Sequence, residues 1–260
     1  MSESDRTLYD EIKDFLQAER DVFGEFSITL PGDVTSKDTE PKSELAVEEE
    51  PEELPAEKFG SNRELTLEEK LAACASLEEL HSLCEQAEEL KTDLDNTNLV
   101  FGVGNPNADL MLIGEAPGEQ EDLQGEPFVG AAGRLLNKIL SAIKFNRDDV
   151  YIANILKHRP PGNRNPKPEE CQKSLPYLYR QIEIIKPKLI LCLGRISGNT
   201  MLNIERSLKD MRGKSHPFRD IELFVTYHPA ALLRNPQWKR PTWEDVQTVR
   251  KRYDELGGKP

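Results

Sequence analysis

Residues 112–133 read LIGEAPGEQEDLQGEPFVGAAG, and the predicted fold is built around them. An apolar run from Asp109 to Ile113 ends abruptly at Gly114, which is typical of a buried strand that stops at a turn. Residues after such a strand lie at the carboxyl edge of an open α/β sheet, where these sheets place ligands. Among the residues that follow, three acids and one aromatic ring stand out: Glu115, Glu121, Asp122 and Phe128. A ring beside carboxylates predicts a pocket for a flat polar ligand.

Strand-like and helix-like segments alternate through the rest of the chain. Short apolar runs predict strands at residues 109–113, 150–155, 189–193 and 223–226, and an edge strand at 99–102. Apolar residues at helical spacing predict helices at residues 66–74, 77–90, 133–143, 169–185, 195–202 and 241–256. This order predicts an α/β fold in which helices cover both faces of a parallel sheet.

The chain divides into two parts by composition. Residues 31–62 are rich in Glu, Pro, Ser and Lys and poor in aromatic residues, so they cannot bury enough apolar surface to offset their ordering entropy. We expect a largely disordered acidic extension at residues 1–64, with one amphipathic helix at about 8–23 that either docks on a partner protein or frays. The folded domain is expected at residues 65–257.

Charge is distributed unevenly between these parts. The net charge is −13, yet residues 127–260 carry 25 Lys or Arg against 13 Asp or Glu. A basic half predicts an anionic partner such as nucleic acid, and the alternative is an unevenly charged solvated surface. No apolar run reaches the roughly 18 residues of a membrane helix. Four cysteines without a dense disulfide pattern predict a protein of the cytoplasm.

Three predicted strands end in loops of unusual content, and parallel strands would bring these loops to one edge of the sheet. Their side chains suit a pocket for a nucleobase taken out of the helical stack. Phe128 would stack on the base, Asn154 would pair with its polar edge, and His228 would stabilise charge that grows on it. Each has a simpler alternative: Phe128 as a core residue, Asn154 as a strand-end cap, and His228 with Pro229 as a rigid turn.

The three loops resemble the motifs of the family 4 uracil-DNA glycosylases. The motifs are Gly-Glu-Ala-Pro-Gly from Gly114 with Pro-Phe-Val-Gly from Pro127, Asn-x-x-Lys-x-Arg-Pro-Pro-x-Asn-Arg from Asn154, and His-Pro-Ala-Ala-Leu-Leu-Arg from His228. The resemblance covers roughly residues 98–256. It implies a three-layer α/β/α sandwich with a central four-stranded parallel sheet, and hydrolysis of the N-glycosidic bond of deoxyuridine in DNA.

The resemblance also implies roles for individual residues. Glu115 and the backbone at Ala116 would line the uracil pocket with Phe128 and Asn154. Glu121 would act with Asn163 to order the pocket or the attacking water, and His228 would stabilise the leaving uracil anion. The cations expected to hold DNA are Lys157, Arg159, Arg164 and Arg234. Leu232 and Leu233 are expected either to act as apolar wedges in the DNA or to start a buried helical turn. Because Ala116 stands where other superfamily members carry an Asp base, we expect a dissociative mechanism.

Family members usually hold a [4Fe-4S] cluster on four cysteines, and this chain departs from that pattern. Cys84 and Cys171 match two ligand positions, but the other two are Ala87 and His158. We therefore hypothesise that the cluster is lost and that side-chain packing replaces it. The alternative is a different ligand set that recruits Cys74, whereas Cys192 is expected in the core.

Two other functions stay open at this point. One is a catalytically weak or silent DNA-binding or scaffold protein. The other is a covalent linkage of His158 to the deoxyribose of an abasic site. The expected partners are uracil-containing DNA and a protein that binds the acidic leader, and the protein is expected to be a monomer.

Overall fold

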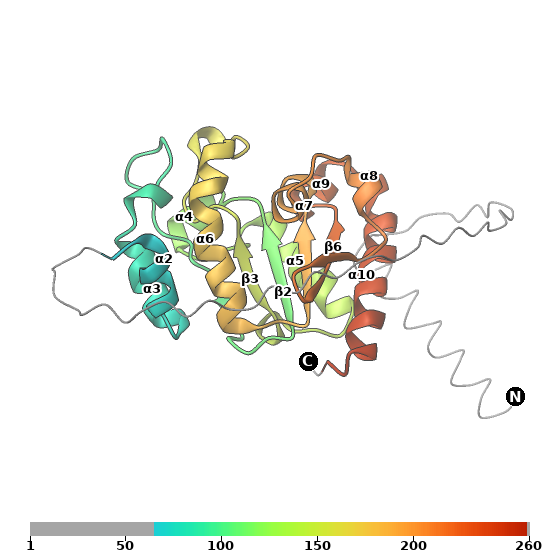
Figure 1. Ribbon diagram of the computed structural model, residues 1–260. Coiled ribbons are helices and arrows are strands. Elements are labelled where there is room, and N and C mark those ends of the chain that lie inside the picture. Colours follow the sequence, from blue (N-terminus) through green and yellow to red (C-terminus); the bar gives the residue numbers. More distant parts are fainter. Residues whose placement is uncertain (1–64, 259–260) are drawn as a thin grey trace, which may run out of the picture. The chain divides into compact units, whose positions relative to one another are not determined.

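The computed structural model describes residues 65–258 (Figure 1). The expected acidic extension at residues 1–64, including its helix at about 8–23, lies outside the described residues. The described part contains the alternating strands and helices that the sequence predicts, but the helix predicted at residues 77–90 is wrong in length, since it ends at Glu85 and a 3₁₀ turn follows at Glu88–Leu90.

The strands of the described part form one sheet of six strands in the order β1-β3-β2-β4-β6-β5. The four inner strands are parallel, as predicted. They are β3 (Tyr151–Asn154), β2 (Leu110–Gly114), β4 (Leu189–Leu193) and β6 (Ile221–Thr226). Two short antiparallel strands extend the edges: β1 (Val103–Gly104) beside β3, and β5 (His216–Phe218) beside β6. The four-stranded parallel sheet is thus the centre of a mixed sheet.

The predicted edge strand at residues 99–102 is wrong in position, since β1 begins at Val103. The backbone is in an unusual conformation at Gly102, where φ is +146°. The segment before this glycine instead runs beside the end of β3, where the Val100 N–H donates to the Lys157 carbonyl at 2.8 Å.

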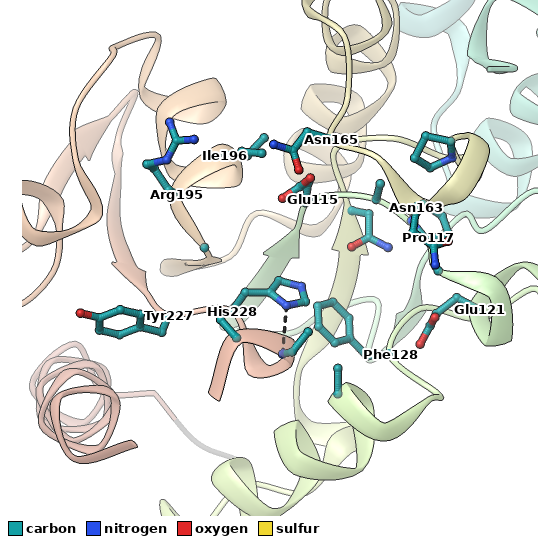
Figure 2. Close-up of a pocket in the computed structure, with 18 of the residues that line it drawn as sticks. Glu115, Pro117, Glu121, Phe128, Asn163, Asn165, Arg195, Ile196, Tyr227 and His228 are labelled. Carbon is teal, nitrogen blue, oxygen red and sulfur yellow. Dashed lines mark hydrogen bonds between the residues drawn. The ribbon is translucent and has the colours of Figure 1, made fainter. Parts of the chain in front are cut away.

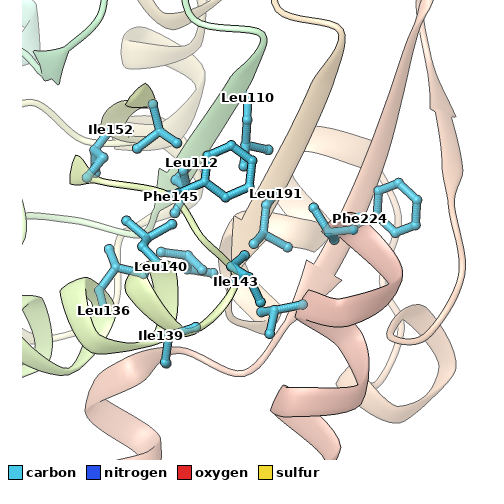
Figure 3. Close-up of a cluster of buried hydrophobic side chains, with 14 of the residues drawn as sticks. Leu110, Leu112, Leu136, Ile139, Leu140, Ile143, Phe145, Ile152, Leu191 and Phe224 are labelled. Carbon is cyan, nitrogen blue, oxygen red and sulfur yellow. The ribbon is translucent and has the colours of Figure 1, made fainter. Parts of the chain in front are cut away.

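Helices cover both faces of the sheet, which gives three layers (Figure 1). Alternate residues of the strands face opposite sides, so Leu110 and Leu112 join one hydrophobic cluster while Met111 and Ile113 join the other. The first cluster packs against α5 (Ala131–Ala142), α9 (Pro229–Arg234) and α10 (Lys239–Glu255) (Figure 3). The second packs against α6 (Pro168–Ile185), α7 (Arg195–Leu202) and α8 (Leu208–Met211). Cys192 is fully buried in this second cluster, as expected.

A third, smaller cluster joins α2 (Leu67–Ala73) and α3 (Leu77–Glu85) to α6. Each of these two helices begins with a capping box, at Thr66 and Ser76, in which side chain and backbone satisfy one another's hydrogen bonds. The remaining short elements are α4 (Glu119–Gln124) and four 3₁₀ turns at Glu88–Leu90, Arg147–Asp149, Pro161–Asn163 and Pro236–Trp238. No helix among residues 65–258 is both long and apolar enough to cross a bilayer.

Candidate active site

One cavity of about 720 Å³ opens at the carboxyl edge of the four parallel strands. It is lined by residues from all three predicted loops, so the sheet does bring them together. The predicted site residues that line it are Glu115, Ala116, Glu121, Phe128, Asn154, Asn163, Arg164, His228 and Arg234 (Figure 2).

Asn154 ends β3 directly beside Gly114, the last residue of β2. A Cβ atom at position 114 would lie 2.2 Å from the Asn154 Oδ1 and 2.7 Å from the Phe128 ring. Only glycine therefore lets the amide and the ring share this space. The Asn154 Oδ1 is buried and has no hydrogen-bond partner, which is costly unless a ligand supplies a donor.

The loop that carries Phe128 is held from several directions. Phe128 adopts a left-handed conformation with φ of 54°, which is uncommon for an aromatic residue and is typical of functional sites. The Arg147 guanidinium donates to the Phe128 carbonyl at 3.2 Å. The Glu121 Oε1 accepts from the backbone N–H groups of Val129 and Gly130, both at 3.0 Å. Glu121 thus orders the loop after Phe128.

His228 precedes α9, and its ring lies 5.4 Å from the Phe128 ring, centroid to centroid (Figure 2). Its Nδ1 accepts from the Ala230 backbone N–H at 3.2 Å, so in the neutral ring the proton is on Nε2. Burial, and to a smaller extent the positive charge of Arg234, lower the pKa of His228 to about 4. At neutral pH the ring is therefore an uncharged hydrogen-bond donor through Nε2.

Glu115 is the carboxylate whose protonation is most altered at the cavity. Burial raises the pKa of Glu115 to about 6, and the positive charge of Arg195 partly opposes this effect. Ala116, the next residue, offers no carboxylate. Asp122 does not line the cavity, and its buried carboxylate accepts a hydrogen bond from the Asn98 backbone N–H at 2.8 Å.

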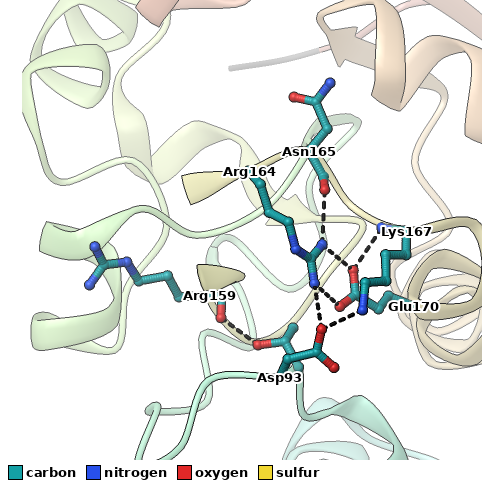
Figure 4. A network of polar contacts seen from close by, with 7 residues as sticks. Asp93, Arg159, Arg164, Asn165, Lys167 and Glu170 are labelled. Atoms are coloured by element: carbon teal, nitrogen blue, oxygen red, sulfur yellow. Dashed lines mark hydrogen bonds and ion pairs between the residues drawn. The ribbon is translucent and has the colours of Figure 1, made fainter. Parts of the chain in front are cut away.

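The predicted DNA-binding cations have different environments. Arg164 is tied to Glu170 at 2.6 Å and to Asp93 at 3.2 Å (Figure 4). Arg159 donates through Nε to the Asn163 Oδ1 at 2.8 Å and does not line the cavity. Arg234 is exposed at the rim of the cavity.

The prediction that Lys157 holds a DNA phosphate is wrong, because its side chain is fully buried. Its ammonium donates to the carbonyls of Phe101 and Asn154 and to the Gln181 Oε1. Burial lowers the pKa of Lys157 to about 8, so the protonated form still predominates at pH 7.

The two adjacent leucines of α9 also differ. Leu232 is fully buried in the first hydrophobic cluster, so the prediction that it is an exposed wedge is wrong and its alternative, a buried helical turn, is the better description. Leu233 is 50% exposed. Neighbouring residues on a helix point about 100° apart, so only one of the two faces the core.

The residues at the family's cluster positions do not fit an iron–sulfur cluster. Ala87 has no donor atom and is packed with Cys84 among the apolar side chains of the third cluster. Cys171 belongs to the second cluster instead. His158 is buried, and its Nδ1 lies 2.9 Å from the Thr97 hydroxyl. His158 does not line the cavity, so its position does not support attack on an abasic sugar.

Several residues at the site were missed by the sequence reasoning. Arg195 and Ile196, the first residues of α7, line the cavity, and so do Tyr227 and Trp238, whose rings stack at 5.0 Å. Arg147 is remote in sequence from the Phe128 loop that it holds. The glycine after β4, Gly194, was the signal for the start of α7 at the cavity, because that strand is parallel to the other three.

The cavity lies at the carboxyl edge of a parallel α/β sheet, where such sheets bind ligands. Residues 101–247 match the family described as the uracil DNA glycosylase superfamily, and the chain belongs to that superfamily. It is similar to the type-4 uracil-DNA glycosylases of three archaea. The identity to that of Archaeoglobus fulgidus is 44% over 179 residues, 65% of this chain and 88% of the relative. The identity to the protein of Sulfurisphaera tokodaii is 45%, over 63% of this chain and 82% of the relative. The identity to that of Pyrobaculum aerophilum is 43%, over 65% of this chain and 91% of the relative.

Proposed function

We propose that this protein is a uracil-DNA glycosylase of the type-4 kind, which hydrolyses the N-glycosidic bond of deoxyuridine in DNA. The observation that carries the proposal is the buried, unpartnered Oδ1 of Asn154 beside the Phe128 ring. Uracil offers an N3–H donor and an O4 acceptor on one edge, and a carboxamide pairs with both. Cytosine offers no donor at N3, so the same amide discriminates against it.

Phe128 and His228 complete the recognition of the base. The Phe128 ring stacks on uracil, and the Nε2–H of the neutral His228 donates to the O2 on which negative charge grows. As the glycosidic bond breaks, its electron pair goes to uracil N1 and leaves the sugar cationic at C1′. Water then adds to C1′ and releases a proton.

The carboxylates have separate tasks in this mechanism. Glu121 holds the loop after Phe128 through two backbone N–H groups, while Glu115 faces the cavity and stabilises the cationic sugar or polarises water. No acid stands at Ala116, which favours a dissociative reaction that depends on charge stabilisation. Asn163 ends the turn Pro161–Asn163 and lines the cavity, where it helps to order the attacking water.

DNA is held at the rim of the cavity. Arg234 is an exposed cation that can bind backbone phosphates, and Leu233 fills the gap left by the extruded base. Arg164 lines the cavity while paired with Glu170 and Asp93, and Arg159 holds the Asn163 amide from outside the cavity. Leu65 and Leu123 are also exposed, but neither has an assigned role.

The proposed enzyme acts without an iron–sulfur cluster. Apolar packing around Ala87, together with hydrogen bonds from the Arg180 guanidinium to the Cys74 carbonyl at 2.8 and 3.1 Å, joins α2 and α3 to α6. Iron and acid-labile sulfide assays on anaerobically purified protein test this point. About four iron atoms per chain would refute it and would favour a ligand set that includes Cys74.

The activity is tested with a single-stranded oligonucleotide that contains one uracil. After incubation and alkali treatment, strand cleavage at that position is expected, with none in matched oligonucleotides that carry cytosine or thymine. Binding without cleavage at any salt concentration would refute the enzyme and favour a DNA-binding scaffold. A protein–DNA adduct that survives denaturation and is absent in His158→Ala would favour the crosslinking function instead.

A further inference from the structure

Lys157 is a buried cation whose hydrogen-bond partners are all uncharged. Its Nζ donates to the Gln181 Oε1 at 2.6 Å, the Asn154 carbonyl at 3.1 Å and the Phe101 carbonyl at 3.2 Å. An ammonium has three N–H donors, so each one is used. A buried charge without a carboxylate partner is costly to keep, and such a group calls for a functional explanation.

The ammonium is connected to the cavity through Asn154. It binds the backbone carbonyl of the residue whose side-chain amide lines the cavity. The next backbone N–H, that of Ile155, donates to the Gly114 carbonyl at 3.0 Å. The peptide group after Asn154 is therefore held at both ends, which fixes the strand position from which the amide projects.

The other cations at the cavity are in a different dielectric environment. Arg195 and Arg234 are exposed at its rim, where water and salt screen their charge. Arg164 also lines the cavity, but its charge is paired with Glu170 and Asp93. Lys157 is fully buried, so its field is much less screened over the same distance. His228 is neutral, whereas the Lys157 ammonium is a fully buried positive charge bound to the backbone carbonyl of the base-binding residue Asn154.

We propose that Lys157 is a positioning residue that acts through Asn154: its ammonium fixes the Asn154 backbone, and its charge stabilises the negative charge that grows on the departing uracil. The inference rests on the proposed glycosylase function and adds a residue that does not touch the base.

The test compares two leaving groups in wild type and in Lys157→Met, which keeps an unbranched side chain of nearly the same length but removes the charge. Single-stranded oligonucleotides of one sequence carry either uracil or 5-fluorouracil, and single-turnover release is measured by alkali cleavage. Fluorine stabilises the base anion, so release of 5-fluorouracil depends less on charge supplied by the protein. We expect release of uracil to fall about tenfold and that of 5-fluorouracil about threefold or less. The ratio of the two rates does not depend on the folded fraction, so it stays informative if the variant is unstable.

Lys157→Arg is the matched control, because it alters the same buried site but keeps the charge. Its ratio of uracil to 5-fluorouracil release is expected to equal that of wild type. Equal losses for both bases in Lys157→Met, or the same altered ratio in Lys157→Arg, would overturn the inference and leave the proposed function intact. Failure of the wild-type protein to release either base would instead refute the proposed function and this inference with it.

Discussion

The substitution Gly114→Ala tests whether the cavity works as the structure indicates. A Cβ atom at this position would approach the Asn154 Oδ1 to 2.2 Å and the nearest Phe128 ring atom to 2.7 Å. Ordinary van der Waals separations are about 3.5 Å, so the two groups together must move by roughly 1 Å. Both are the groups proposed to hold uracil.

The size of the effect follows from this displacement. A misplacement of about 1 Å in a group that positions the substrate costs on the order of 100-fold in rate. This corresponds to about 2.7 kcal/mol in the activation free energy. Overpacking also lowers the free energy of unfolding by about 1–3 kcal/mol. Since domains of this kind are stable by roughly 5–15 kcal/mol, the variant is expected to remain folded.

Single-turnover excision from a uracil-containing oligonucleotide measures the rate, and urea unfolding measures the stability. Gly198→Ala is the matched control, because its Cβ atom would lie 2.8 Å from the Val225 Cγ1 in the core rather than in the cavity. The control is expected to lose stability and to keep excision within about threefold of wild type. The reasoning is refuted if Gly114→Ala keeps wild-type activity, or if both variants lose excision equally.

Further predictions concern four other residues. Asn154→Asp is expected to reduce excision about 100-fold with little loss of DNA binding, because the donor to uracil O4 is lost. DNA binding is measured by gel shift, and equal losses of excision and binding would assign Asn154 to folding. Excision is expected to fall as the pH drops below about 6, where the Glu115 carboxylate becomes protonated, and a pH–rate profile of Glu115→Gln should lack this limb. The same limb in the variant would contradict the assignment, since the pKa of His228 is about 4. Leu232→Ala should lower the free energy of unfolding by about 2–5 kcal/mol, whereas Leu233→Ala should leave it unchanged and reduce excision from duplex more than from single-stranded DNA. Similar behaviour of the two variants in urea unfolding would contradict the burial that separates them.

The arrangement of strands and helices was predictable because its signals are local. Apolar runs that end in glycine, as at Gly114 and Gly194, mark parallel strands whose carboxyl ends meet at one edge of the sheet. The meeting of Phe128, Asn154 and His228 in one cavity follows from that topology, and the structure confirms it.

The order of the elements, the chemistry of the three loops and the presence of Ala87 where a cluster ligand would stand could all be predicted from the sequence. Which side chains of those loops face the cavity depends on tertiary packing. Lys157 lies in a basic motif that predicts a contact with a DNA phosphate. Its ammonium instead donates hydrogen bonds to Phe101 and Gln181, which are remote in sequence. Leu232 and Leu233 are identical in type, and packing of α9 against the sheet buries one and exposes the other. Burial depends on neighbours that are distant along the chain, so no local pattern encodes it.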